Sequence, residues 1–295
     1  MPNTHPVTIG SETHGLAGNL VLPDGAAAGA PVPGAVIVGG PGPLPQQRYS
    51  SEGAKQWPVL WSEALGAAGV GAVCYDQRGS GLSTGAYHEA DRTALCDDAR
   101  AFVEVLALQP EVGPVAAVAW GEGCGFALQL AAEGVVHALV LMAPPFHTEE
   151  ARYGRSIARL AASKGLSDRV VQVRIDQWRN GILSATRRVQ EGETTTTVDL
   201  GGQPVTTSLV RFLQNVAFDP APLVRKVNVP VLLLHGDDDQ AIPASESEAM
   251  ARELPGPVDR ITYPGVAHFL YRHPRAIHDA AAWIKRTLSH APGER

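Results

Sequence analysis

An alternation of short, uninterrupted apolar runs with longer helical segments constrains the fold of this chain most. Apolar runs lie at residues 35–38, 70–75, 138–142 and 229–235, and another begins the segment 115–133. Segments with helical spacing lie at residues 57–68, 91–108 and 244–254. Strands that alternate with helices form βαβ units, and strands without polar residues are buried on both faces of a sheet. The sequence therefore predicts an α/β fold with a mostly parallel central sheet flanked by helices.

The alternation is interrupted once, after the Ala-Pro-Pro-Phe segment at residues 143–146. We expect helices at residues 148–164 and 166–190, and a hairpin that turns at Gly201 and Gly202. A helix to residue 216 follows, and the alternation then resumes. We therefore predict an inserted, mainly helical cap at residues 147–220, and a core formed by residues 1–146 and 221–295.

Charge and cysteine content restrict the partners and the compartment. The 295-residue chain has a formal net charge of −6 and no long basic run, which disfavours nucleic acids and anionic membranes. No signal peptide and no membrane-spanning apolar run is evident. Cys74, Cys96 and Cys124 are not spaced as metal ligands, and their small number is typical of a reducing compartment. We expect a cytoplasmic protein that binds a small molecule and uses no metal or organic cofactor; its oligomeric state is not predicted.

Loops that follow parallel strands are the natural place for a ligand. The first, Gly-Gly-Pro-Gly-Pro-Leu-Pro at residues 39–45, offers close backbone approach and N–H groups for an oxyanion at Gly40 and Gly42. Pro41 has no N–H to donate, so an oxyanion donor is missing if this residue occupies the donor position. The loop is also simply rich in turn-forming residues.

Two later loops contain an acid and a histidine. The segment His-Gly-Asp-Asp-Asp at residues 235–239 places Asp239 after a strand, and His268 lies in the loop before the last helix. A carboxylate that orients an imidazole produces a general base. The alternatives are a solvated turn for the three aspartates and a structural role for a lone histidine.

The segment 115–133 forms a strand, a glycine-rich corner and a helix. Gly121 occupies the corner, where it supplies no nucleophilic side chain. The N–H of Glu122, at the start of the helix, is a candidate oxyanion donor, and its carboxylate is a candidate acid. Cys124, nearly one helical turn further on, is a candidate nucleophile, with a small buried residue as the alternative.

In these motifs, in their order and over nearly its whole length, the chain resembles the α/β-hydrolase family. The resemblance is greatest to cap-bearing esterases and to the branch similar to prolyl iminopeptidases. The family's nucleophile elbow, Gly-x-Ser-x-Gly, corresponds to residues 119–123. It implies that Asp239 is the acid and His268 the base of a triad, and that the residue at 124 is a small one packed on the sheet.

The departures from the family pattern concern the nucleophile and its neighbours. Gly121 replaces the serine, Ala119 replaces the first glycine, and Trp120 stands where histidine is frequent. We therefore count Gly40, Pro41, Gly42, Glu122 and Trp120 as candidate oxyanion or substrate-binding positions.

Three functions remain open from the sequence. The first is non-hydrolytic base chemistry of a lyase, isomerase or cyclase type by His268 and Asp239, on a small apolar substrate, with bacterial specialised metabolism as the expected setting. The second is a carboxylesterase-like hydrolase in which the serine has been replaced by Gly121. The third is a protein that binds a small molecule without catalysis.

Overall fold

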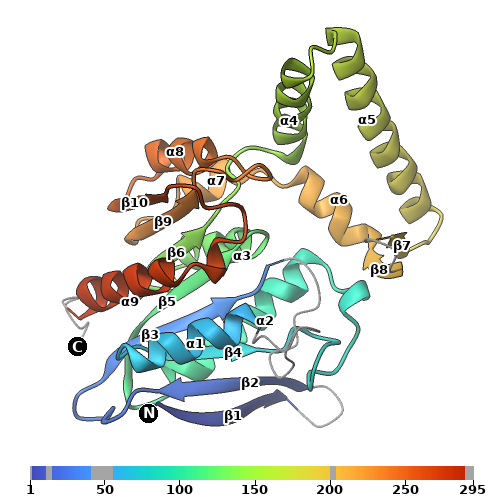
Figure 1. Cartoon of the computed structure of the whole chain (residues 1–295). Coiled ribbons are helices and arrows are strands. Elements are labelled where there is room, and N and C mark those ends of the chain that lie inside the picture. Colours follow the sequence, from blue (N-terminus) through green and yellow to red (C-terminus); the bar gives the residue numbers. More distant parts are fainter. Residues whose placement is uncertain (1, 11–14, 41–55, 200–203, 290–295) are drawn as a thin grey trace.

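One eight-stranded sheet organises the computed structural model, which describes residues 2–10, 15–40, 56–199 and 204–289 (Figure 1). Its strand order is β1-β2-β4-β3-β5-β6-β9-β10. β1 (Asn3–Gly10) and β2 (Gly15–Leu22) form an antiparallel hairpin, and β2 is antiparallel to β4. The remaining six strands pair with one another in parallel. In spatial order they are β4 (Gly71–Tyr75), β3 (Val32–Val38), β5 (Val112–Trp120), β6 (Ala138–Met142), β9 (Val231–Gly236) and β10 (Val258–Tyr263). The predicted fold class is confirmed.

The first strand differs from its prediction. We expect it at residues 7–10, but β1 begins at Asn3 because its backbone pairs with β2 along its full length, from Asn3 opposite Leu22 to Gly10 opposite Gly15. The polar residues of β1 do not prevent this pairing, since the strand lies at the edge of the sheet and most of its residues are exposed.

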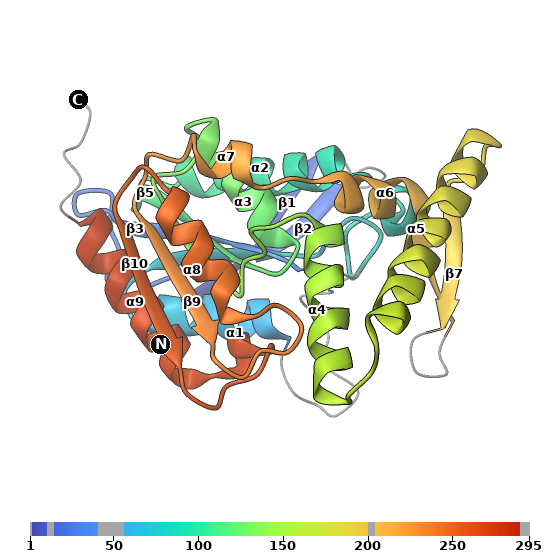
Figure 2. The same cartoon turned by 90° about the horizontal axis from the view of Figure 1, so that it is seen from above.

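Two hydrophobic layers cover the two faces of the sheet. In β3, Ala35 and Ile37 belong to one layer while Val36 and Val38 belong to the other, as the two-residue period of a strand requires. The first layer contains α1 (Trp57–Ala67) and α9 (Pro274–Leu288). The second contains α2 (Arg92–Ala107), α3 (Gly123–Ala132), α7 (Ala221–Val224) and α8 (Ala244–Glu253). Figure 2 shows α2 and α3 on one side of the sheet and α1 and α9 on the other.

The connection between β6 and β9 contains the elements expected of the cap. These are α4 (Glu149–Ser163), α5 (Asp168–Gln190), the antiparallel pair β7 (Thr195–Asp199) and β8 (Pro204–Ser208), and α6 (Leu209–Ala217). In Figure 1, α4 and α5 project away from the sheet. The predicted turn residues Gly201 and Gly202 lie outside the described residues.

A buried carboxylate joins this connection to the core. Glu246 of α8 accepts hydrogen bonds from the backbone N–H groups of Phe146 and His147, each at 2.9 Å. The Glu246 side chain is only 2% exposed and also pairs with Arg155 of α4 at 2.6 Å. The end of the loop after β6 and the helix α4 are therefore held against the core by one residue.

Two 3₁₀ helices, η1 (Tyr87–Glu89) and η2 (Leu270–Arg272), complete the regular structure of the described residues. Within that part of the chain, no helix is both long and apolar enough to span a membrane.

Candidate functional site

The corner between β5 and α3 has the backbone of a tight elbow. Gly121 has a φ of +59°, a left-handed backbone conformation that residues other than glycine adopt only at a cost in free energy. A Cβ on Gly123 would lie 2.4 Å from the carbonyl oxygen of Gly39 and 2.7 Å from that of Val38. The first turn of α3 therefore packs directly on the end of β3, and the glycine at 123 makes this contact possible.

The loop after β3 reaches the same place. A Cβ on Gly40 would lie 2.4 Å from Cε3 of Trp120, so this glycine also allows a close approach. The side-chain amide of Gln77 donates to the carbonyl oxygen of Gly40 at 3.3 Å. Pro41 and Gly42, the other two candidates of this loop, lie outside the described residues.

Asp239 and His268 are in direct contact. Nδ1 of His268 lies 2.8 Å from Oδ2 of Asp239, whose side chain is fully buried, whereas the imidazole is 22% exposed. Oδ1 of Asp239 accepts the backbone N–H groups of Ala241 at 2.9 Å and Ile242 at 2.8 Å. A carboxylate only accepts hydrogen bonds, so Nδ1 carries the proton and Nε2 is left as the basic nitrogen.

The surroundings of Asp239 favour its charged form. Burial by itself raises the pKa of this carboxyl, but the interactions with His235 and His268 and the hydrogen bond from Ile242 outweigh burial. The net result is a pKa well below the ordinary value. Asp239 is therefore a carboxylate throughout the neutral range and can stabilise a protonated imidazole beside it.

Trp120 packs against the dyad. Its ring centroid lies 5.1 Å from that of His268, and its Nε1 donates to the backbone carbonyl of His268 at 3.3 Å. Tyr271 contacts the Trp120 ring edge-on at 4.7 Å. Trp120, at the position where histidine is frequent in the family, therefore supports the loop of His268. Trp57 and Trp61 are buried in the core, and Trp178 of α5 stacks on Tyr153 of α4.

A cavity of about 170 Å³ brings the candidates together. Trp120, Gly121, Glu122 and His268, all expected from the sequence, line it. The remaining lining residues were not expected from the sequence, and they are Arg92, Gly125, Pro145, Glu149, Arg152, Asn215, Phe218 and Ile242. Gly125 comes from α3, and the others come from α2, α4, α6 and loops, where they belong to no recognisable motif. The lining therefore combines apolar side chains with charged and polar ones, and the apolar substrate stays a prediction.

The carboxylate and the backbone N–H of Glu122 have different surroundings. Its carboxylate accepts the side-chain amide of Asn215 at 2.7 Å and lies 3.8 Å from Nε of Arg211, so the side chain is engaged and turned into the structure. Its backbone N–H, at the start of α3, has no acceptor among the described residues. The N–H is therefore the group of Glu122 that is free to contact a ligand.

The side chains that offer an alternative nucleophile do not face this cavity. Cys124 is fully buried, its Sγ lies 3.6 Å from the carbonyl oxygen of Met142, and burial raises its pKa. Ser80 and Ser83 donate to the backbone carbonyls of Gln77 and Asp76 within their turn. No serine, threonine or cysteine is among the described residues that line the cavity. The described part of the chain also holds no group of three or more potential metal ligands.

This arrangement of sheet, elbow, acid and histidine defines the α/β-hydrolase fold. Residues 60–275 match the family model of the serine aminopeptidases, S33, and the chain belongs to that family. A solved structure of a hypothetical protein from Pseudomonas aeruginosa shares the fold, with a TM-score of 0.70 and 18% identity over 97% of this chain and 94% of that one.

Two characterised relatives are hydrolytic enzymes. A bifunctional esterase/perhydrolase from Acinetobacter calcoaceticus is 25% identical, over 68% of this chain and 75% of its own length. A monoacylglycerol lipase from Mycolicibacterium smegmatis is also 25% identical, over 76% of this chain and 81% of its own length.

Proposed function

We propose that this protein is an enzyme that works without a serine nucleophile and uses His268 and Asp239 as a general base on a small molecule. One observation carries the proposal: a histidine held by a buried carboxylate at 2.8 Å lines the same cavity as Gly121, a residue with no side chain. The base is retained where the nucleophile of the fold is replaced.

The chemistry follows from the tautomer of the imidazole. Nε2 of His268 takes a proton from a carbon acid, a phenol or a water, and the carboxylate of Asp239 stabilises the imidazolium that results. The same proton returns to another atom of the substrate in a later step. Elimination, isomerisation and ring closure all use such a transfer, so the reaction is of a lyase, isomerase or cyclase type.

The elbow contributes space and a hydrogen-bond donor. Without a side chain at position 121, a substrate atom or a water fits where the hydroxyl of a serine would lie. The N–H of Glu122, which has no acceptor among the described residues, stabilises negative charge that develops on a substrate oxygen after deprotonation. Trp120, Phe218 and Ile242 supply apolar contacts in the same cavity.

A carbon acid without an ester bond tests the proposal directly. In 5-nitrobenzisoxazole, removal of the proton on the ring carbon breaks the N–O bond and releases a coloured nitrophenolate, so only a base is needed. We expect turnover above the buffer rate that falls about 10²–10⁴-fold in His268→Ala. Turnover that is equal in the two proteins, or absent from both, would contradict the proposal and favour a protein that binds without catalysis.

The relatives support one alternative, a carboxylesterase-like hydrolase whose serine is replaced by Gly121. Labelling by a fluorophosphonate, read by intact mass, discriminates between the two functions because this probe marks only an activated serine. Under the alternative, Gly121→Ser gains one adduct at position 121 while the parent gains none. Under our proposal, the folded variant stays unlabelled, because we expect Pro41, which has no N–H, at the second donor position of the oxyanion loop.

A further inference from the structure

Arg92 occupies an unusual position at the edge of the cavity. It is the first residue of α2, and its backbone N–H donates to Oε1 of Gln214 at 2.8 Å. Its Nη1 donates to Oδ1 of Asn215 at 2.6 Å. The guanidinium lies over the ring of Phe218 at 3.9 Å and near that of Phe126 at 5.0 Å. A cation is thus placed between two aromatic rings and an amide, all of which are neutral.

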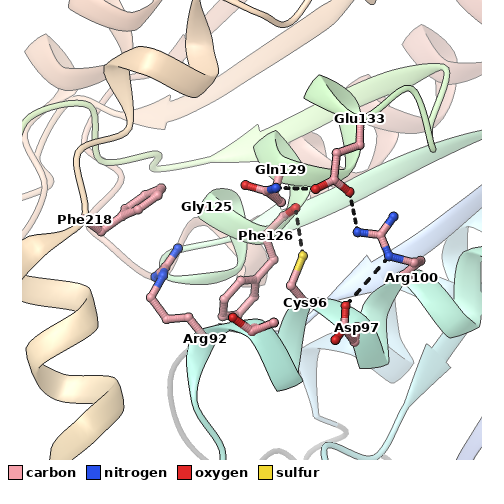
Figure 3. A pocket seen from close by; sticks show the side chains of 10 residues that line it. Arg92, Cys96, Asp97, Arg100, Gly125, Phe126, Gln129, Glu133 and Phe218 are labelled. Carbon is pink, nitrogen blue, oxygen red and sulfur yellow. Dashed lines mark hydrogen bonds and ion pairs between the residues drawn. The ribbon is translucent and has the colours of Figure 1, made fainter.

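No carboxylate forms an ion pair with Arg92 among the described residues. Arg100, eight residues further along α2, provides the contrast, because it pairs with Glu133 and with Asp97. Figure 3 shows that network, with Arg92 apart from it between Phe218 and Phe126. Burial lowers the pKa of Arg92, and the nearby charge of Glu122 only partly opposes this effect.

The two acids near Arg92, Glu122 and Glu149, interact with other residues and form no ion pair with it. The Glu122 carboxylate accepts a hydrogen bond from Asn215 and lies beside Arg211. Glu149 lines the same cavity, where burial raises its pKa and the charge of Arg152 opposes that rise. Within the described part of the chain, Nε and Nη2 of Arg92 have no acceptor. These two N–H groups form the edge of a guanidinium that matches a carboxylate in a bidentate pair.

Arg92 also lies between two cavities and lines both of them. Together with Gly125 and Phe218, it lines both the cavity at Gly121 and a second one of about 270 Å³ between α2 and α3. A Cβ on Gly125 would lie 2.6 Å from Nη2 of Arg92, so the glycine leaves room for the guanidinium. Arg92 is therefore reached from the cavity that holds His268, and its position depends on a small residue at the start of α3.

We propose that Arg92 binds a carboxylate of the small molecule held beside His268. The inference deepens the proposed function, on which it rests for the identity of the site, and names its substrate class as a carboxylic acid. An anion at this position supplies the charge partner that the chain itself does not provide. Because the cavity is small, the carboxylate and the atom that loses its proton belong to the same compact molecule.

Titration calorimetry with phenylacetate and its neutral counterpart phenylacetamide tests the inference. The two probes share their size and ring, so their affinity ratio reports the charge. We expect phenylacetate to bind at least about tenfold more tightly to the parent. The preference should disappear in Arg92→Gln and persist in part in Arg92→Lys. Arg100→Gln is the matched control, since Arg100 lines only the second cavity and has its own acidic partners; this variant should keep the preference.

If Arg92→Gln does not fold, Gly125→Ala displaces the guanidinium instead and should weaken phenylacetate binding. A preference that survives in Arg92→Gln, or a parent that does not favour the anion, would overturn the inference. His268→Ala should keep the preference although it loses turnover of 5-nitrobenzisoxazole. An Arg92-dependent preference without any base-catalysed turnover would therefore refute the proposed function and leave the carboxylate site standing.

Discussion

The most informative single change is Asp239→Asn, because the two side chains have nearly the same shape. Asp239 has three donors within hydrogen-bond distance: the N–H groups of Ala241 and Ile242, and Nδ1 of His268. Its side chain is fully buried, so these bonds are not screened by water. Asparagine keeps the oxygen that accepts the two backbone N–H groups, but places either an uncharged acceptor or an N–H₂ opposite His268.

The expected cost follows from these contacts. A hydrogen bond to a charged acceptor is stronger than its neutral equivalent by about 0.5–1 kcal/mol, so three weakened bonds lower the free energy of unfolding by about 2 kcal/mol at pH 7. The amide N–H₂ also donates to Nδ1, which moves the imidazole proton to Nε2. The base turned toward the cavity then becomes a donor, and base-catalysed turnover should fall about 10²–10⁴-fold.

The effect on stability should depend on pH in a defined direction. The pKa of Asp239 is lower in the folded protein than the ordinary value of about 4, so its carboxylate contributes stability above pH 4. This contribution is lost as the pH falls below about 4 toward the folded-state value. Asp239→Asn should therefore be less stable than the parent at pH 7, and the difference should narrow on acidification.

Urea unfolding at pH 7 and pH 3.5 measures the stability difference, and ¹⁵N NMR of the imidazole reports the tautomer. We expect Nδ1–H in the parent and Nε2–H in the variant. Equal stability of the two proteins at pH 7, together with an unchanged tautomer, would refute the reasoning that Asp239 anchors and orients His268.

Two further changes test the structure around the site. Gly123→Ala should lower the free energy of unfolding by about 2–4 kcal/mol in urea, since its Cβ would lie 2.4 Å from a backbone oxygen of Gly39; Gly134→Ala, at a positive φ but in open space, should cost only about 1 kcal/mol. Glu246→Gln should lower stability by about 2 kcal/mol and hasten proteolysis within residues 147–220, because it weakens the bonds to Phe146, His147 and Arg155. Cleavage at the parental rate would argue against this anchoring role.

The core of the fold was predictable because its pattern is local. Buried parallel strands need continuous apolar residues, so β4, β6 and β9 are visible as short runs without any knowledge of their neighbours. The length of β1 was underestimated, since its edge pairing with β2 depends on backbone hydrogen bonds, which its mixture of polar and apolar residues does not indicate. The positions of Gly121 and Glu122 at the elbow also followed from the sequence, through the strand, glycine and helix order that a tight corner requires.

The sequence by itself thus determined the sheet, the glycine at the corner between β5 and α3, and the loops of Asp239 and His268. Only the tertiary structure placed Arg92 beside Asn215, which is 123 residues away in the sequence. It also turned the Glu122 carboxylate to Asn215, and it turned the Cys124 thiol to the carbonyl of Met142 in the sheet. The physical reason is the range of the interactions. Strand and helix patterns depend on neighbours within a few residues, whereas the charge and shape of the cavity depend on how the connection between β6 and β9 returns over the core.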